Sequence, residues 1–246
     1  SGAFASSTTY VAGNAILKAA EELTQKICRQ GAALLNCSEE EVAYDGGVYV
    51  KVEPERRVSI EAIGTKAEGG GTQQILSTAT YISGLAPLTF MSGFAEIDLD
   101  PETGKLQLLR YVSVADCGKV LNPALTRVQA EGGVLMGIGM ALYENVHYNA
   151  DGKLLTDSFL QYKIPGREDL PPGCIQVDFA ESNEPSGPYG AKSIGEAALH
   201  TVAPAIGNAL MNAAGILLHS LPFTSEKIYW ALQNKKSGQE QGEGKL

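Results

Sequence analysis

The sequence lacks the features that mark membrane spans, secretory signals and nucleic-acid binding. Its 246 residues contain no apolar run of about eighteen residues, and no charged start followed by an apolar stretch. Lys and Arg number 19 against 28 Asp and Glu, so the net charge is −9, the wrong sign for a surface that gathers phosphates. We therefore expect no membrane and no nucleic acid as partners, and a cytoplasmic location.

Cysteine and histidine are too few and too scattered to hold a metal. The four cysteines lie far apart without a CxxC spacing, and the three histidines show no pattern typical of a metal site. We therefore assign no protein ligand to a metal and expect reduced structural thiols. These residues are Cys28, Cys37, Cys117, Cys174, His147, His200 and His219.

The remaining pattern predicts an α+β fold of mixed helices and largely antiparallel sheet, either a single unit or bilobed. A hydrophobic content of 44% allows one large core or two smaller ones. Apolar residues recur at intervals of three and four over residues 11–30, as in an amphipathic helix. β-prone runs at 95–100 and 105–114 flank the turn PETG and predict a hairpin. Further strands are expected at 48–52 and 175–180.

A second helix is expected from Pro123 to Glu144, with Asn122 as its N-cap. Four glycines stand inside it, and each costs roughly 0.5–1 kcal/mol relative to alanine in a helix interior. Something must approach this backbone closely, either a neighbouring helix or strand, or a cofactor. The glycines are Gly132, Gly133, Gly137 and Gly139.

The last third predicts more helix and a tail. An apolar helical region runs from 197 to 219, with Pro204 breaking or kinking it. Thr224 can cap a final helix that ends near Gln233. Residues 235–246 lack the apolar side chains that would offset the entropy of ordering, so we expect one domain over residues 1–234 followed by a mobile tail.

The stretch GAKSIGEAAL places the carboxylate of Glu196 behind Gly195 at the expected start of a helix. Ser193 and Glu196 fit the spacing of a capping box, in which the glutamate serves structure alone. The alternative is a catalytic carboxylate. Lys192, near a turn, is expected in solvent, and Asp116 is expected to hydrogen-bond the turn of DCG.

Near the N-terminus, the segment FASSTTYVAGNA puts small and hydroxyl residues just before the first helix. Backbone N–H groups and the helix dipole favour an anion such as a phosphate at that place. In the simpler interpretation, Thr8 or Thr9 merely caps the helix.

Three segments together resemble a known enzyme family. They are DCGKVLNPALTRVQAEGGVLMGIGMALYENV at 116–146, QYKIP at 161–165 and GPYGAKSIGEAAL at 187–199. In order and spacing they resemble the molybdenum hydroxylases, the family of xanthine dehydrogenase and aldehyde oxidase. The likeness is to the C-terminal half of the molybdopterin-binding subunit and extends from about residue 3 to 232. The chain is therefore expected to be part of a larger enzyme.

The resemblance implies roles for individual residues. It implies that Glu196 is the general base beside the molybdenum, which the pterin holds without a protein ligand. It also implies that the segment around Ser6 and the glutamine on the second helix bind the pterin, while Phe4 departs from the family's small residue. The cofactor-binding residues implied are Ala5, Ser6, Ser7, Thr8, Gln129 and Gly195.

The resemblance further implies a molybdopterin-dependent hydroxylase or dehydrogenase that oxidises an electron-poor carbon of a purine-like or other N-heteroaromatic substrate. An aldehyde oxidoreductase of the same family and a noncatalytic assembly module stay open as alternatives. The expected cofactor is molybdenum-molybdopterin, with the cytosine dinucleotide form as one option. The remaining half of the molybdopterin subunit is an expected partner. Iron–sulfur clusters and FAD are expected on other subunits or segments.

Overall fold

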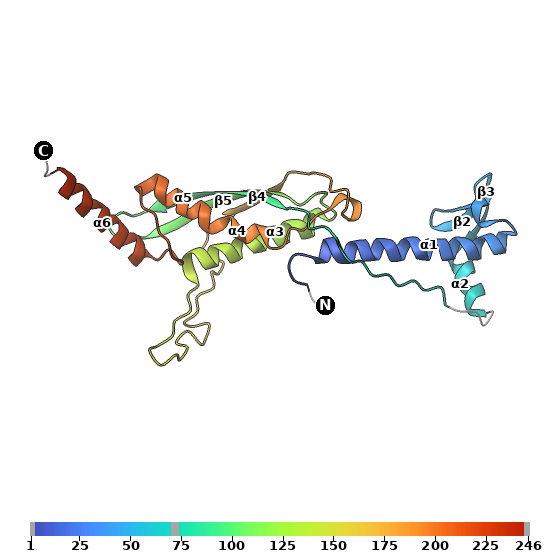
Figure 1. Cartoon of the computed structure of the whole chain (residues 1–246), viewed down its shortest axis with the longest axis horizontal. Coiled ribbons are helices and arrows are strands. Elements are labelled where there is room, and N and C mark those ends of the chain that lie inside the picture. The colour runs from blue at the N-terminus through green and yellow to red at the C-terminus, as the bar shows by residue number, and fades with distance from the viewer. Residues whose placement is uncertain (1–2, 70–73, 244–246) are drawn as a thin grey trace. The chain divides into compact units, whose positions relative to one another are not determined.

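Two structural units make up the chain, each with its own hydrophobic core (Figure 1). The computed structural model describes the backbone of residues 3–69 and 74–243 and the side chains of residues 3–67 and 74–237. One unit is Ser7–Ala86, and the other joins Ser1–Ser6 to Pro87–Leu246. The mixed α+β class is confirmed. The domain boundary expected at residue 234 stays a prediction.

The smaller unit consists of one long helix against a small antiparallel sheet. A π-helical turn, η1 (Thr8–Ala12), continues into α1 (Gly13–Leu35), which confirms and extends the helix predicted at 11–30. The short helix η2 (Glu39–Glu41), the strands β1 (Val42–Tyr44), β2 (Gly47–Val50) and β3 (Glu53–Ser59), and the helix α2 (Ile60–Gly69) follow. The strands pair in the order β1-β2-β3.

A glycine lets α1 approach this sheet. A Cβ built on Gly31 would lie 2.5 Å from the Cβ of Val48, a distance that real side chains do not tolerate. Val48 is fully buried, together with Ile63 of α2. The smaller core therefore depends on a position without a side chain. The sequence pattern missed β3 and α2 because charged residues dominate β3, and α2 has a short, mixed pattern.

The larger unit is built on the predicted hairpin. Strands β4 (Phe90–Leu99) and β5 (Leu106–Asp116) pair antiparallel across the turn at residues 101–104, which confirms the hairpin. Strand β6 (Ile175–Phe179) confirms the run predicted at 175–180 and pairs parallel to β5. The sheet order is β4-β5-β6. The two sheets are thus largely antiparallel, with one parallel pair among the strands described.

Helices cover one face of the sheet. Helix α3 (Pro123–Ile138) with its π-helical end η3 (Gly139–Tyr143) and helix α5 (Val202–Ala214) pack beside β4, β5 and β6, with the short α4 (Ala197–His200) against α3 (Figure 1). Tyr111 of β5, Val134 of α3 and Ile206 of α5 are fully buried in the core between them. Phe90 and Phe94 of β4 are exposed, at 60% and 66%.

The predicted cap and two of the four glycines explain how α3 begins and how it packs. The Asn122 side chain accepts a hydrogen bond from the Leu125 N–H at 3.1 Å, which confirms the N-cap. A Cβ on Gly133 would lie 2.6 Å from the Cβ of Ala198, and one on Gly137 would lie 2.8 Å from the Leu199 carbonyl oxygen. A neighbouring helical segment is therefore the close neighbour at these two positions. Gly132, in contrast, faces open space.

Three predicted helix boundaries were wrong. The break falls at Thr201, between α4 and α5, and Pro204 lies in the first turn of α5, where a missing N–H is tolerated. Helix α5 ends at Ala214 and not at 219, because Gly215 adopts a left-handed φ of 64°. Helix α6 (Ser225–Glu243) continues past the end expected near Gln233. Thr224 caps it as predicted, accepting from the Lys227 N–H at 3.3 Å. The mobility expected of residues 235–246 stays a prediction, and residues 244–246 lie outside the described part.

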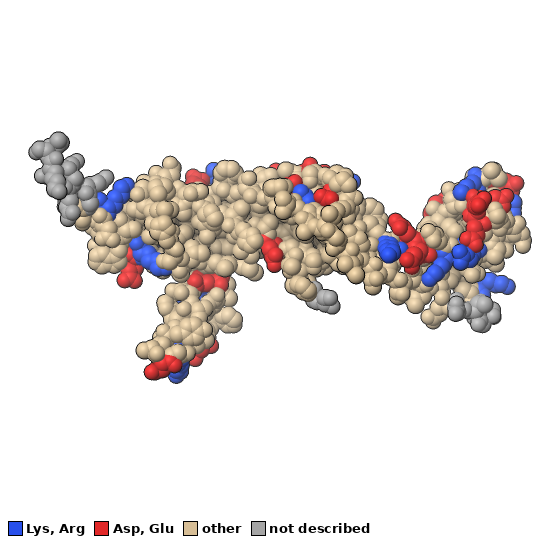
Figure 2. Space-filling model, in the orientation of Figure 1, with Lys and Arg blue, Asp and Glu red and all other residues tan. Residues whose placement is uncertain are grey.

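Charges of both signs are mixed on the face of the molecule drawn in Figure 2. On the face drawn in Figure 2, Lys and Arg stand singly or beside Asp and Glu, without a broad basic area among the residues drawn in colour. This distribution agrees with the net charge of −9. In the part of the chain that the structure describes, no helix combines the length and apolarity needed to cross a membrane.

Candidate functional site

Glu196 occupies the N-cap position of α4 and its side chain is exposed. Its backbone N–H donates to the Ser6 hydroxyl oxygen at 2.8 Å. The capping-box alternative was wrong, because the helix starts at Ala197 and Ser193 lies three residues before the N-cap. The Glu196 carboxylate makes no hydrogen bond or ion pair with the residues described.

Ser6 reaches Glu196 through an unusual backbone and a glycine. Ala5 and Ser6 both adopt left-handed conformations, with φ of 51° and 52°, which are costly for residues other than glycine. A Cβ on Gly195 would lie 3.0 Å from the Ser6 hydroxyl oxygen, so a side chain there would crowd the contact. The fold therefore brings three predicted site residues together: Ser6, Gly195 and Glu196.

Gln129 lies on α3 one turn before Gly133, on the same side of the helix. Gly133 packs on the α4 segment, where a Cβ would lie 3.5 Å from the Gly195 carbonyl oxygen. Gln129 is exposed, and its amide has no hydrogen bond within the described chain. The α3 face that carries Gln129 therefore adjoins the segment that leads to Glu196.

Ser7 and Thr8 belong to the smaller unit. Ser7 is the N-cap of η1, and its carbonyl oxygen accepts from the Val11 N–H at 2.7 Å. The alternative that Thr8 or Thr9 caps the helix was therefore wrong. Phe4, the predicted departure from the family, is 64% exposed.

Lys192, four residues before Glu196, is buried and forms an ion pair with the partly exposed Asp116. The Lys192 ammonium donates to Asp116 Oδ2 at 2.8 Å and to the Leu88 carbonyl oxygen at 2.9 Å. It also lies 5.4 Å from the centre of the Phe90 ring. The Lys192 side chain is 8% exposed, so the expectation that it is solvated was wrong.

The Asp116 carboxylate accepts hydrogen bonds from three segments of the chain. Its Oδ1 accepts from the Gly118 N–H at 3.0 Å, which confirms the predicted turn, and from the Ser182 hydroxyl at 2.6 Å. Burial favours the neutral acid. The hydrogen bonds from Lys192, Ser182 and Gly118, with the Lys192 charge, outweigh it and lower the pKa of Asp116 below its ordinary value.

Backbone bonds attach the same segment to the loop after β5. The 3₁₀ turn η4 (Pro188–Gly190) leads into Ala191, which forms an antiparallel bridge with Gly118. The Lys192 N–H donates to the Cys117 carbonyl oxygen at 2.7 Å. One step further, the Ser193 carbonyl oxygen accepts from the Thr89 hydroxyl at 2.8 Å. Residues 190–193 are thus held by main chain and side chains together.

Sequence reasoning missed the Asp116–Lys192 pair because the two residues stand 76 positions apart. A lysine beside a turn is ordinarily solvated, and no local spacing links it to an aspartate after a distant strand. One signal was present. Asp116 in DCG and Lys192 in GAKSIGE stand in two of the three segments that carry the family resemblance.

The cysteines and histidines form no metal site. Cys117 and Cys174 are buried, Cys28 and Cys37 are half-buried, and all four are free thiols. Desolvation raises the pKa of Cys117 and of Cys174. In the described part of the chain, no three His, Cys, Asp or Glu side chains gather as metal ligands.

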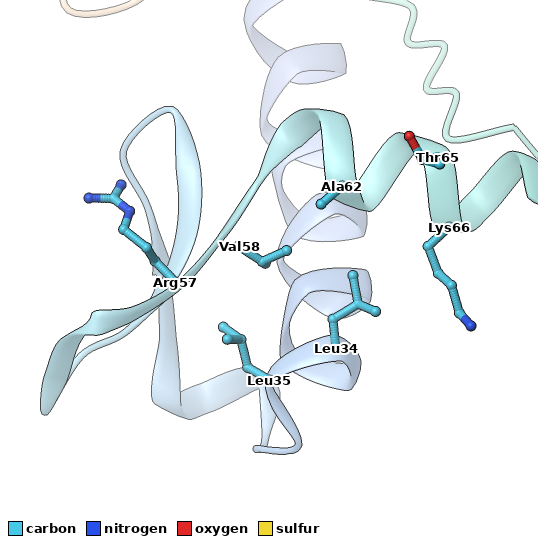
Figure 3. A pocket seen from close by; sticks show the side chains of 7 residues that line it. All are labelled: Leu34, Leu35, Arg57, Val58, Ala62, Thr65 and Lys66. Atoms are coloured by element: carbon cyan, nitrogen blue, oxygen red, sulfur yellow. The ribbon is translucent and has the colours of Figure 1, made fainter.

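A cleft of about 770 Å³ lies within the smaller unit (Figure 3). Leu34, Leu35, Val58 and Ala62 give it an apolar wall, and α1, β3 and α2 contribute its sides. None of the predicted site residues lines it. The full lining is Leu34, Leu35, Arg57, Val58, Ala62, Thr65 and Lys66.

A family match identifies the class of this domain. Residues 1–171 match the family of molybdopterin cofactor-binding domains. This match covers more than half of the chain, and the chain belongs to that family, the cofactor-binding part of the molybdenum hydroxylases.

Individual relatives agree with this assignment. The chain is 36% identical over 235 residues to the "Probable hypoxanthine oxidase XdhD" of Escherichia coli (strain K12), covering 94% of this chain and 24% of that protein. It is 34% identical over 142 residues to the aldehyde oxidoreductase molybdenum-binding subunit PaoC of the same organism, covering 57% of this chain and 19% of that protein. The solved structure of quinoline 2-oxidoreductase from Pseudomonas putida 86 superposes with a TM-score of 0.82 at 26% identity, covering 94% of this chain and 31% of that one. The chain thus spans less than a third of the length of these relatives.

Proposed function

We propose that this chain forms part of a molybdopterin-dependent hydroxylase or dehydrogenase in which Glu196 is the general base. The observation that carries the proposal is the hydrogen bond from the Glu196 N–H to Ser6, a residue of the segment with the implied pterin contacts. This bond fixes the main chain of Glu196 while its carboxylate stays exposed and unpaired within the described chain. A base needs that combination of fixed position and free oxygen atoms.

The residues present fit a pterin cofactor. Gly195 leaves room at Ser6 that a side chain would fill, and the Gln129 amide is exposed and without a partner in the described chain. The first turn of the helix that begins at Thr8 leaves backbone N–H groups without acceptors inside the helix, as a phosphate requires. We propose Ala5, Ser6, Ser7, Thr8, Gln129 and Gly195 as the residues that hold the pterin.

When bound, molybdopterin supplies the two-electron redox chemistry. The chain contributes orientation and proton transfer. Glu196 accepts the proton of the attacking oxygen nucleophile, which requires its carboxylate to lie within about 2.6–3.2 Å of that oxygen. Gln129 and the Ser6 segment orient the pterin. No side chain of this chain is proposed as a metal ligand.

The proposed substrate carries an electron-poor carbon in a purine-like or other N-heteroaromatic ring. The named relatives that act on hypoxanthine and quinoline favour this class. The aldehyde oxidoreductase relative favours an aldehyde as the second candidate. A noncatalytic assembly module is the third candidate, and the exposed carboxylate of Glu196, whose N–H is bound by Ser6, argues against it.

We propose as partners the rest of the molybdopterin subunit together with subunits or segments that carry iron–sulfur clusters and FAD. Relatives of which this chain covers 19% to 31% support this proposal, because most of each relative lies outside the matched part. The cytosine dinucleotide form of the pterin and a cytoplasmic location stay predictions.

The test is Glu196→Gln in the complete enzyme, with Glu226→Gln as a control at an exposed glutamate in the first turn of α6. We expect Glu196→Gln to lower turnover with xanthine, nicotinate and aldehydes by about 10²-fold or more, the scale for a lost general base. Molybdenum and pterin contents should match wild type in both variants. Retention of most activity in Glu196→Gln would show that the base assignment is wrong.

A further inference from the structure

We propose that Lys192 and Asp116 are positioning residues for Glu196, and that the ion pair of the buried Lys192 with Asp116 fixes the segment that presents the base. This inference rests on the proposed function of Glu196. It assigns a role to two residues outside the cofactor and base contacts proposed above.

Three anchors fix the segment from Lys192 to Glu196. The Lys192 ammonium binds Asp116, at the end of β5, and the carbonyl of Leu88, just before β4. The Ser193 carbonyl is bound by Thr89 at 2.8 Å, and the Glu196 N–H by Ser6 at 2.8 Å. Two of these anchors connect the segment to the paired strands β4 and β5. A site held by strands is positioned more accurately than one held by loops.

Gly195 makes these anchors necessary. It stands directly before Glu196 and has no Cβ, because a side chain there would crowd Ser6 at 3.0 Å. Glycine restricts its backbone less than any other residue, so the chain between Ser193 and Glu196 is weakly defined by its own conformational preferences. The direction of the Glu196 side chain therefore depends on contacts at both ends of this short stretch.

Stability near neutral pH does not by itself account for a lysine buried at this place. Lys192 is the one charged residue that is buried among the side chains the structure describes. Desolvation opposes such a pair, and well-packed apolar replacements are often neutral or stabilising. The ion pair does fix the position of Lys192 relative to the strands. The Lys192 ammonium is held by two acceptors from different segments and lies 5.4 Å from the centre of the Phe90 ring. Together with the Lys192 N–H, which donates to the Cys117 carbonyl oxygen at 2.7 Å, these contacts hold the residue at both its main chain and its side-chain end.

The experiment uses the complete enzyme with Lys192→Met, which removes the charge and keeps the length of the side chain, and Asp116→Asn, which keeps the shape of its partner. Arg110→Met is the matched control, because it breaks the exposed Arg110–Glu96 ion pair of the same sheet, 3.1 Å long. We expect kcat to fall about 10- to 100-fold in Lys192→Met and less in Asp116→Asn, as for a misplaced catalytic group. KM should stay within about threefold, because substrate contacts are unchanged.

Two measurements separate positioning from folding. Molybdenum content should match wild type, and amide exchange should rise at residues 193–197 while the buried turns of α5 around Ile206 and Leu210 stay protected. Lys192→Arg, which keeps the charge and two donors, should recover most of the lost kcat. Loss of molybdenum together with faster exchange throughout α5 would overturn the proposal in favour of a structural role. Wild-type kcat in Lys192→Met would also overturn it.

A double variant distinguishes this proposal from the proposed function. If Lys192 acts through Glu196, adding Lys192→Met to Glu196→Gln costs little further activity, whereas independent roles give additive losses. Additive losses would therefore overturn the positioning role while leaving the base assignment standing. Full activity of Glu196→Gln alone would remove the base assignment, and the exchange at residues 193–197 would still report whether the ion pair fixes the segment.

Discussion

The Ser6 hydroxyl accepts a hydrogen bond from the backbone N–H of Glu196 at 2.8 Å, across 190 positions of sequence. The contact requires left-handed backbone at Ala5 and Ser6 and the absence of a side chain at Gly195. Strained backbone is retained where surrounding contacts determine it, and such residues gather at functional sites. The segment implied to bind the pterin and the segment of the proposed base are therefore parts of one local arrangement.

Replacement of Ser6 should change cofactor content more than stability. In the complete enzyme, Ser6→Leu should lower pterin and molybdenum occupancy severalfold, because a branched side chain fills the space beside Gly195. Ser6→Ala removes the hydrogen bond without adding bulk and should keep more cofactor. Metal analysis by mass spectrometry, with thermal unfolding measured alongside, checks this. Equal cofactor content in wild type and Ser6→Leu would contradict the assignment of Ser6 as a pterin residue.

The glycines of α3 offer a test of close packing. Gly137→Ala should lower the free energy of unfolding by about 1–3 kcal/mol, the usual range for overpacking, since its Cβ would lie 2.6 Å from Val202 Cγ2 and 2.8 Å from the Leu199 carbonyl oxygen. Gly132→Ala, five positions away on the same helix, meets open space. Gly132→Ala should raise the free energy of unfolding by roughly 0.5–1 kcal/mol, because alanine has a higher helix propensity than glycine.

Urea unfolding of the purified chain measures both glycine variants under one condition. If Gly132→Ala and Gly137→Ala lowered the free energy of unfolding by similar amounts, close packing at Gly137 would not be the cause of the difference we expect.

Local sequence patterns predicted most helices and strands, whereas contacts between residues far apart in the sequence could not be predicted. The hairpin of β4 and β5, the Asn122 cap and the helix before Leu35 follow from alternation, spacing and capping chemistry that a short window contains. The parallel pairing of β6 with β5 and the Asp116–Lys192 pair are set by tertiary packing, which no window shows. The wrong break at Pro204 has a local reason, because proline fits the first turn of a helix.

The same distinction applies to the candidate site: its short motifs could be predicted, and its long-range contact could not. The Gly195-Glu196 pair and the segment Ser6–Thr8 could be identified from the sequence because each is short. The hydrogen bond between Ser6 and Glu196 could not be predicted, because it requires left-handed backbone at Ala5 and Ser6. Alanine and serine rarely adopt that conformation, so the sequence gives no sign of it. The capping-box interpretation failed for the same reason. Spacing alone could not tell that the Glu196 N–H is bound by a residue from the other end of the chain.

The lowered pKa of Asp116 predicts acid sensitivity with a defined sign. Hydrogen bonds from Lys192, Ser182 and Gly118 overcome desolvation and lower this pKa in the folded state. A carboxyl whose folded pKa lies below its unfolded value, about 3.9, contributes stability above that value. This contribution is lost as the pH falls through the folded pKa. Asp116→Asn should therefore differ most from wild type in stability near neutral pH, and the difference should shrink below about pH 4.

Urea unfolding of wild type and Asp116→Asn at several pH values between 3 and 7 checks this sign. Asp157→Asn, in an exposed loop position, is the control and should track wild type throughout. A stability difference between wild type and Asp116→Asn that grows as the pH falls would contradict the assigned direction.

Expressed alone, this polypeptide should fold but hold no stoichiometric molybdenum. The larger unit has its own apolar core, with buried residues from Leu108 to Leu232, and we expect this core to support folding of the isolated chain. Helix α3, however, leaves Leu125 and Val128 each 67% exposed and Met136 56% exposed, as expected of a helix that packs on further protein. The relatives extend to more than three times the matched length, so we expect that enclosing a cofactor needs protein beyond the part matched by this chain.

The measurement is metal analysis of the isolated chain, purified from a host that makes molybdopterin, together with turnover of xanthine, nicotinate and aldehydes. Circular dichroism and a cooperative thermal transition establish that the chain is folded, so that missing metal cannot be assigned to unfolding. The complete subunit from the same host, prepared in parallel, should contain molybdenum and is the control for cofactor supply. Stoichiometric molybdenum with turnover in the isolated chain would show that Ser6, Gln129 and Glu196 form a sufficient site without the rest of the subunit.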